Sequence, residues 1–162
     1  LIKVAKQLEA ENVKFIIVGA DFTEEEDYKQ KLEEVINDLD LADNVVLTGF
    51  REDVKKLMNL FDILAIPSKR EAFGLVAIEG MAAKTTVVAS DVDGLSEIVE
   101  HQATGLLIDP SDKSAWKKNL LEVINNPKMR DKLANKGYQR AKDKFSLEIM
   151  VKETEKLYLD LG

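Results

Sequence analysis

Two glutamates flank a glycine in the stretch SKREAFGLVAIEGMAAK, residues 68–84. Glu71 precedes a segment with helical spacing of its apolar residues, and Glu79 lies inside that segment. Carboxylates accept hydrogen bonds from hydroxyl groups, and a helix N-terminus offers unpaired backbone N–H groups and a positive dipole end to phosphate. The stretch therefore combines side chains that bind hydroxyls with a backbone feature that binds phosphate.

The spacing of these groups fits three parts of one ligand. We predict that the helix begins near Phe73 or Gly74, and glycine at this place lets a ligand approach the backbone closely. Glu79 follows Gly74 by five residues, which is about 7 Å along a helix axis and roughly the offset between a diphosphate and its ribose. Glu71 lies before the helix, on the opposite side of the expected phosphate site. One carboxylate for ribose, the helix end for a diphosphate and one carboxylate for the group that the diphosphate carries together describe a nucleotide sugar.

Glutamate spacing alone is weak evidence for such a site. The chain has 16 glutamates, and the same spacing of eight occurs twice more within residues 25–34. Glu71 could simply complement a helix dipole, and Glu79 could be a surface residue of the helix. The context, with Pro-Ser before the first glutamate and Phe-Gly between the two, favours a ligand site.

Strand-like and helix-like segments alternate up to Asp109-Pro110, after which the pattern is helical. Compact apolar runs predict buried strands at 13–19, 44–50, 62–68, 85–90 and 104–109. Apolar residues at spacings of three and four predict helices at 23–42, with Thr23 as N-cap, and at 51–61, 73–84, 95–100, 111–126, 127–145 and 146–162. This order predicts an α/β fold, with a Rossmann-like parallel sheet flanked by helices on both faces and a helical C-terminal segment.

The 162 residues, 45% of them hydrophobic, are enough for a single domain spanning 1–162. Ligands of an open parallel sheet bind beyond the carboxyl ends of its strands. Glycines such as Gly19 and Gly49 follow the predicted strands here. A tight turn alone would explain any one of them, but their recurrence on one sheet edge favours a ligand site.

The composition excludes several classes of function. The chain has no cysteine and a single histidine, His101, which rules out disulfides and argues against a zinc cluster, so we expect no metal. A net charge of −7 argues against nucleic-acid binding, which requires clustered Lys and Arg. No apolar run approaches the roughly 18 residues of a membrane span. We therefore expect a soluble, cytoplasmic protein without a transmembrane segment.

The motifs NVVLTGF, DILAIPSKREAFGLVAIEGMAA, VVASDVDGLSEIV and TGLLIDPSD resemble, in order and spacing, the carboxyl-terminal domain of group 1 retaining glycosyltransferases of the two-Rossmann-domain (GT-B) type. The likeness covers about residues 13–160. It implies the donor-binding half of an enzyme that moves a hexosyl unit from a nucleotide-diphosphate sugar to a glycan, lipid or small-molecule acceptor, as in polysaccharide biosynthesis. It also implies retention of anomeric configuration, no metal and no other cofactor.

The resemblance assigns roles residue by residue. Glu79 would hold the ribose, and Glu71, the residue assigned to the catalytic site, would bond hydroxyls of the sugar. The backbone of Phe73, Gly74, Leu75 and Val76 would meet the diphosphate and the transferred sugar. Phe50 and Arg51 match positions near the nucleobase. Both glutamates would thus position the donor and would not form the acid and nucleophile pair of a glycosidase.

The chain departs from the family pattern at several positions. The family usually has glycine where Lys84 stands, often proline where Thr86 stands, and a Gly-Gly pair where Asp93-Gly94 stands. The family's basic pair for the diphosphate and its acceptor domain would precede residue 1. We therefore expect a fragment whose partner is the N-terminal domain of the same protein and which alone binds donor weakly and transfers nothing. Lys69 and Arg70 could add charge near the donor, although solvated loop residues are the simpler interpretation.

Two other functions stay open. One is a different GT-B enzyme, such as a nucleotide-sugar epimerase or a phosphorylase, although the extra acids, histidines or cofactor lysine of such enzymes have no evident counterpart here. The other is a non-catalytic nucleotide-binding or scaffold module. Asp93 and Lys84 are its best support, and the presence of both glutamates speaks against it.

Trp116 and the last predicted helix concern packing and not the chemistry of the site. We predict that Trp116 belongs to the core. The last helix is amphipathic through Met150, Val151, Leu157, Tyr158 and Leu161. In the family this helix reaches back to the amino-terminal domain, and alone it would expose an apolar patch or form a dimer contact. A peripheral membrane contact of the full protein also stays open.

Overall fold

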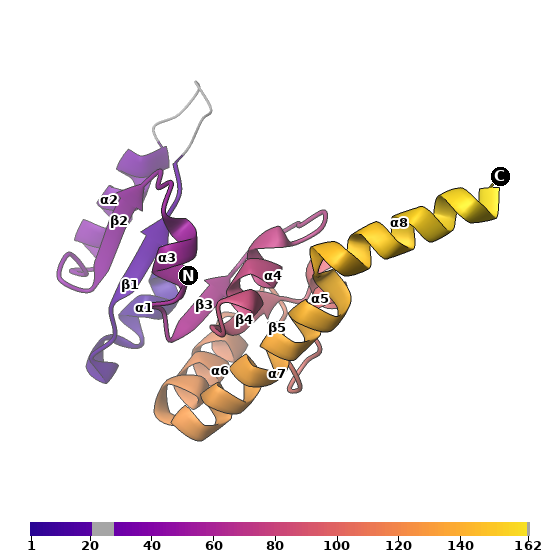
Figure 1. Ribbon diagram of the computed structural model, residues 1–162. Helices are drawn as coiled ribbons and strands as arrows, with labels where there is room; N and C mark the ends of the chain where they lie inside the picture. Colours follow the sequence, from indigo (N-terminus) through magenta and orange to yellow (C-terminus); the bar gives the residue numbers. More distant parts are fainter. Residues whose placement is uncertain (21–27, 162) are drawn as a thin grey trace. The chain divides into compact units, whose positions relative to one another are not determined.

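The computed structural model describes residues 1–20 and 28–161 (Figure 1). It divides into two compact units, Leu1–Val54 and Lys55–Gly162, and each has its own parallel sheet. The predicted α/β fold with parallel strands and flanking helices is confirmed, but the described strands form two sheets where the sequence predicted one. The predicted count of one domain stays a prediction, and Thr23 lies outside the described residues.

The first unit is built on two parallel strands, β1 (Phe15–Val18) and β2 (Val45–Gly49). The register shifts after Ile17, so that Val18 lies opposite Gly49. The other elements are α1 (Ile2–Lys6), a 3₁₀ turn η1 (Glu9–Glu11) and α2 (Tyr28–Asp38). Apolar side chains of α1, α2, β2 and the turn between α2 and β2 form the core of this unit, namely Ile2, Ala5, Ile36, Leu41 and Val45.

The second unit has three parallel strands in the order β3 (Ile63–Ile66), β4 (Thr86–Ser90) and β5 (Leu106–Ile108). All five residues of β4 are buried. A central strand is buried throughout only when helices cover both faces of its sheet, which is why its sequence is a continuous β-branched and small-residue run instead of an alternation.

Helices surround this sheet or continue from it (Figure 1). They are α4 (Leu75–Ala82), α5 (Asp93–Ile98), α6 (Lys113–Asn125), α7 (Pro127–Phe145) and α8 (Leu147–Leu161). A short helix, α3 (Val54–Met58), lies in the chain where the first unit ends and the second begins. The side chains of Asp112 and Asn126 accept hydrogen bonds from first-turn N–H groups of α6 and α7, at 2.8 and 3.0 Å. Such N-caps fix where a helix begins, and Pro127 at the first position of α7 fits the same rule.

Helices α4, α5 and α7 pack against β3 and β4 around one apolar cluster. Its buried members are Ile66, Ala77, Met81, Val87, Ala89, Leu95, Ile98, Val99 and Ala141. Removing this area from water is the main force that holds α4 and α5 in place. Trp116 is buried on α6, as predicted. No helix within residues 1–20 and 28–161 is both long and apolar enough to cross a membrane.

Candidate functional site

The helix that follows the first glutamate begins at Leu75, with Gly74 as its N-cap residue, which confirms the predicted start near Phe73 or Gly74. Gly74 has φ +93°, a left-handed conformation that side chains disfavour. A Cβ at this position would also lie 3.0 Å from both Leu95 Cδ2 and Ile98 Cδ1 of α5. Glycine is therefore required here both by the left-handed backbone and by the close approach of the Leu95 and Ile98 side chains from α5.

The N-terminus of α4 offers free backbone donors. The N–H groups of Ala77 and Ile78 donate to the Gly74 carbonyl at 2.9 and 3.4 Å. In the described part of the chain, no hydrogen bond uses the N–H groups of Leu75 or Val76. Their residues are 65% and 40% exposed. Two unpaired donors at the positive end of a helix, open to solvent, are the elements of an anion site.

Glu71 lies closer to this helix end than its sequence position suggested. Its Oε1 accepts a hydrogen bond from the Gly74 N–H at 3.2 Å, so the carboxylate stabilises the start of α4. The simpler interpretation, in which Glu71 complements the helix dipole, is therefore part of what this residue does. A carboxylate has about four acceptor positions, so one backbone hydrogen bond leaves room for hydroxyl donors.

The start of α5 supports the loop that carries Glu71. The Gly94 N–H donates to the Glu71 carbonyl at 3.1 Å. A Cβ at Gly94 would lie 2.7 Å from Phe73 Cα and 2.8 Å from the Ala72 carbonyl oxygen, both backbone atoms. The Asp-Gly pair gave no signal of this contact in the sequence, because the residues that Gly94 contacts, 71–73, lie far back in the chain. The contact of Gly94 with the loop of Glu71 is thus a feature of the candidate site that was not predicted from the sequence.

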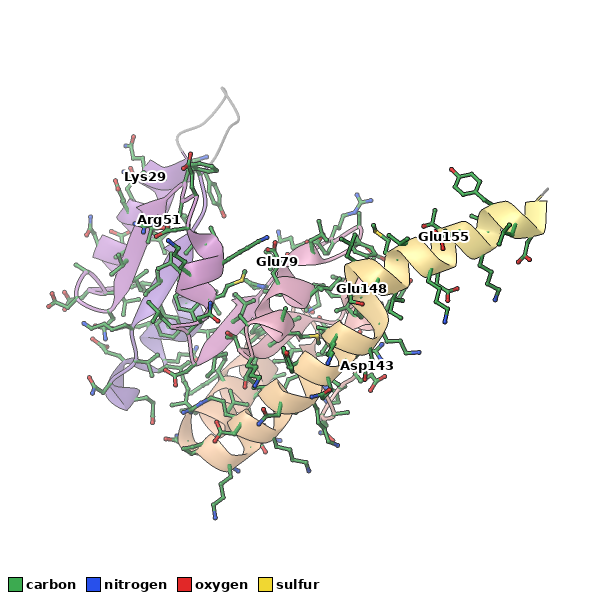
Figure 2. The ribbon with its side chains drawn as sticks, in the orientation of Figure 1. Lys29, Arg51, Glu79, Asp143, Glu148 and Glu155 are labelled. Atoms are coloured by element: carbon green, nitrogen blue, oxygen red, sulfur yellow. The ribbon has the colours of Figure 1, made fainter. Side chains whose placement is uncertain are left out.

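Glu79 projects from α4 and is labelled in Figure 2. Its side chain is 39% exposed, and its Oε1 lies 3.9 Å from the Nζ of Lys55. Lys55 is 84% exposed at its side chain, so this ion pair is loose and contributes little to stability. The carboxylate is thus accessible to a ligand and has one cation within reach.

The first unit carries the other predicted site residues, which are described there by themselves. The Gly19 N–H donates to the Gly49 carbonyl at 3.0 Å, and a Cβ at either glycine would meet no described atom within 4 Å. Phe50 follows and is 64% exposed. Arg51 donates to Asp53 through Nε and Nη2 at 2.7 and 2.6 Å, and this bidentate hydrogen bonding raises the pKa of Arg51.

Both residues that depart from the family glycines have left-handed backbones. Lys84 has φ +57° and Asp93 has φ +27°. The Lys84 ammonium lies 4.8 Å from the centroid of the Tyr138 ring, a favourable cation–π contact. Lys69, Arg70 and His101 are exposed. The exposed His101 accepts the Leu107 N–H through its Nδ1 at 3.0 Å.

Comparison with known proteins places these features in a family. The sequence model described as "Glycosyl transferases group 1" matches residues 1–140. The uncharacterized glycosyltransferase MJ1607 of Methanocaldococcus jannaschii is 35% identical over 157 residues, 94% of this chain and 38% of that protein. The capsular polysaccharide biosynthesis glycosyltransferase CapM of Staphylococcus aureus is 29% identical over 91% of this chain and 38% of that protein. The chain thus spans under two fifths of the length of these relatives.

A solved structure gives the same picture at the level of the fold. The crystal structure of Anabaena Alr3699/HepE in complex with UDP and glucose superposes with a TM-score of 0.90 at 30% sequence identity. The match covers 98% of this chain and 43% of that chain.

Proposed function

The chain belongs to the group 1 glycosyltransferase family, and on this premise we propose that it binds the nucleotide-diphosphate-sugar donor of an enzyme that transfers a hexosyl unit. The observation that carries the proposal is the start of α4. There, the Glu71 carboxylate accepts the N–H of the left-handed Gly74, and among the described residues the N–H groups of Leu75 and Val76 have no partner. The UDP and glucose of the HepE structure support a nucleoside diphosphate as the ligand class.

Within this proposal, each part of the donor has its own contacts. The backbone from Phe73 to Val76, at the start of α4, receives the diphosphate and the sugar, because its free N–H groups donate hydrogen bonds to phosphate oxygens. Glu79 accepts hydrogen bonds from the ribose, and Glu71 accepts them from sugar hydroxyls. The resemblance alone assigns Phe50 and Arg51 of the first unit to the nucleobase.

The chemistry that follows is the family's and is proposed for the full protein. The sugar would pass to a glycan, lipid or small-molecule acceptor with retained configuration and without a metal ion. The name of CapM supports polysaccharide biosynthesis as the setting. In the two-domain arrangement another domain holds the acceptor, so the 162 residues alone should bind donor weakly and transfer nothing. Robust transfer by the isolated chain would contradict this arrangement.

The test is an amide-resolved NMR titration of the chain with UDP, GDP, ADP and dTDP, followed by sugar conjugates of the best binder. We expect saturable shifts at Gly74, Leu75 and Glu79, and the nucleobase with the lowest dissociation constant identifies the donor. Inorganic phosphate serves as the control for charge alone. If no nucleotide changes the chemical shifts of the amides at the start of α4, the proposed function is wrong for this chain. That result would favour the interpretation as a non-catalytic scaffold module.

A further inference from the structure

The guanidinium of Arg140, on α7, is bonded to the last turn of α5. Its Nε donates to the Ile98 carbonyl at 2.6 Å and its Nη2 to the Glu97 carbonyl at 2.8 Å, while Nη1 pairs with the Glu100 carboxylate. The Arg140 side chain is only 21% exposed. The last carbonyls of a helix have no intrahelical partner, and a planar fork of donors satisfies several of them at once in one fixed geometry.

The opposite end of α5 touches the donor loop, which we define as residues 71–74. The Gly94 N–H donates to the Glu71 carbonyl, and Gly94 leaves no room for a Cβ against Phe73. Ile98 connects the two ends directly. Its carbonyl accepts from Arg140, and its Cδ1 lies 3.0 Å from where a Cβ of Gly74 would stand.

We propose that Arg140 is a positioning residue for donor binding, which acts through α5 on the donor loop. α5 has six residues, a rod of about 9 Å, so it transmits a displacement of its last turn to its first. Close-packed interiors have no slack to absorb such a displacement. Without the hydrogen bonds of Arg140 to its last turn, α5 takes a different position. The Gly74 N-cap and the Glu71 carboxylate are then no longer placed to bind the donor. This inference rests on the proposed function of the donor loop.

Arg130 provides a matched control on the same helix. Its side chain is 20% exposed, its Nη1 donates to the carbonyls of Val123 and Ile124 at 3.1 Å, and its Nη2 pairs with Asp62 at 3.3 Å. It therefore caps the end of α6 much as Arg140 caps the end of α5. Replacing either arginine by methionine removes a part-buried fork and one charge, but only Arg140 is connected to the donor loop.

The experiment compares Arg140→Met, Arg140→Lys and Arg130→Met in the 162-residue chain, at a temperature where all three are folded. Dissociation constants are measured for the best nucleotide sugar, and amide shifts of Gly74 and Gly94 are recorded without ligand. We expect Arg140→Met to weaken donor binding about tenfold and to shift both amides, since small misplacements of binding groups are costly. Arg140→Lys keeps the charge near Glu100 but cannot bridge two carbonyls, so it should recover less than half of that loss. Arg130→Met should stay within about twofold of the parent protein despite a similar loss of stability.

Two results would overturn the inference. One is donor binding that Arg140→Met leaves unchanged or that Arg130→Met weakens equally. The other result is that the amide chemical shifts of Gly74 and Gly94 in ligand-free Arg140→Met and Arg140→Lys equal those of the parent chain. The second result is independent of ligand. A parent chain that binds no nucleotide sugar would refute the proposed function, and the amide shifts would still decide whether Arg140 positions the loop.

Discussion

The two glutamates of the candidate site differ in what each is bonded to. Glu71 already accepts the Gly74 N–H, whereas the described contact of Glu79 is a loose ion pair with Lys55. A group that is bonded to the backbone shapes the site as well as binding to it. A group that is open to solvent contributes only when a ligand arrives.

We predict different losses for the two glutamates. Glu79→Ala should weaken bare nucleotide and nucleotide sugar alike by about tenfold, because a hydrogen bond to a charged acceptor contributes about 1.5 kcal/mol or more. Glu71→Ala should reduce mainly the additional affinity that the sugar provides. Calorimetric titration of both ligands measures this, with Glu155→Ala on α8 as the control for charge (Figure 2). Equal losses for both ligands in both variants would contradict the assignment.

Asp93 carries backbone strain at a place where the family usually has glycine. Its φ of +27° lies in the region that side chains disfavour. Asp93 is the first residue of α5, and its side chain is exposed. A negative charge at this end of a helix interacts favourably with the helix dipole. The charge offsets only a part of the strain, so the residue is tolerated without being optimal.

Asp93→Gly should therefore raise the free energy of unfolding by about 1 kcal/mol. Asp91→Gly is the matched control, because Asp91 is also an exposed acid of this loop but is not among the residues with positive φ. That change should destabilise, since glycine gains freedom in the unfolded chain. Chemical denaturation of both variants decides. A stability order with Asp91→Gly above Asp93→Gly would show that backbone strain does not govern this loop.

At the scale of elements, the sequence identified most strands and helices to within a few residues. The run predicted at 62–68 forms β3 from Ile63 to Ile66, and the helix predicted at 73–84 spans Leu75 to Ala82. Continuous apolar runs and 3.6-residue periodicity are local signals, which is why these predictions hold. The helix predicted at 95–100 spans Asp93–Ile98, so both of its ends lie two residues earlier than predicted.

What the sequence did not reveal are contacts between elements. The approach of Gly94 to Phe73, the hydrogen bonds of Arg140 and the division of the strands between two sheets depend on packing over long stretches of chain. A single sequence has no periodicity that encodes such pairs. The two glutamates of the candidate site could be proposed from the sequence because they occur in one contiguous motif, whereas the residues that contact their loop could not.

The contact between α5 and the donor loop leads to a prediction about Gly94→Ala. The added methyl group would meet backbone atoms at 2.7 Å, and backbone cannot rotate away as a side chain can. We expect a loss of about 2 kcal/mol in unfolding free energy together with weaker donor binding. The control is Gly137→Ala inside α7, where the added methyl is 3.0 Å from the Thr104 carbonyl oxygen and where alanine favours the helix. If folded Gly94→Ala bound the donor with unchanged affinity, the packing of α5 against the loop would have no influence on donor binding.

At the scale of the whole chain, α8 stands apart from the packed part of the second unit (Figure 1). None of its described side chains is buried. Its described large apolar side chains are exposed, from Val151 at 45% to Leu159 at 81%, except for the half-buried Ile149. Of the apolar residues predicted from the sequence, Met150, Val151, Leu157 and Tyr158 are exposed. The side chain of Leu161 lies outside the described part of the chain. A 15-residue helix without tertiary packing is only marginally stable in water.

A chain that ends after Ser146 should therefore keep the stability of the second unit. The apolar cluster around β4 receives nothing from α8, and the last member it takes from α7 is Phe145. We expect a midpoint of denaturation equal to that of the full chain within experimental error, because exposed side chains contribute little to unfolding free energy.

Hydrogen exchange of the full chain gives the complementary measurement. Amides of α8 should exchange orders of magnitude faster than those of β4, which is buried at every position and opens only with global unfolding. Strong protection of α8 in dilute solution, or a large loss of stability on its removal, would mean that its apolar face packs against protein after all.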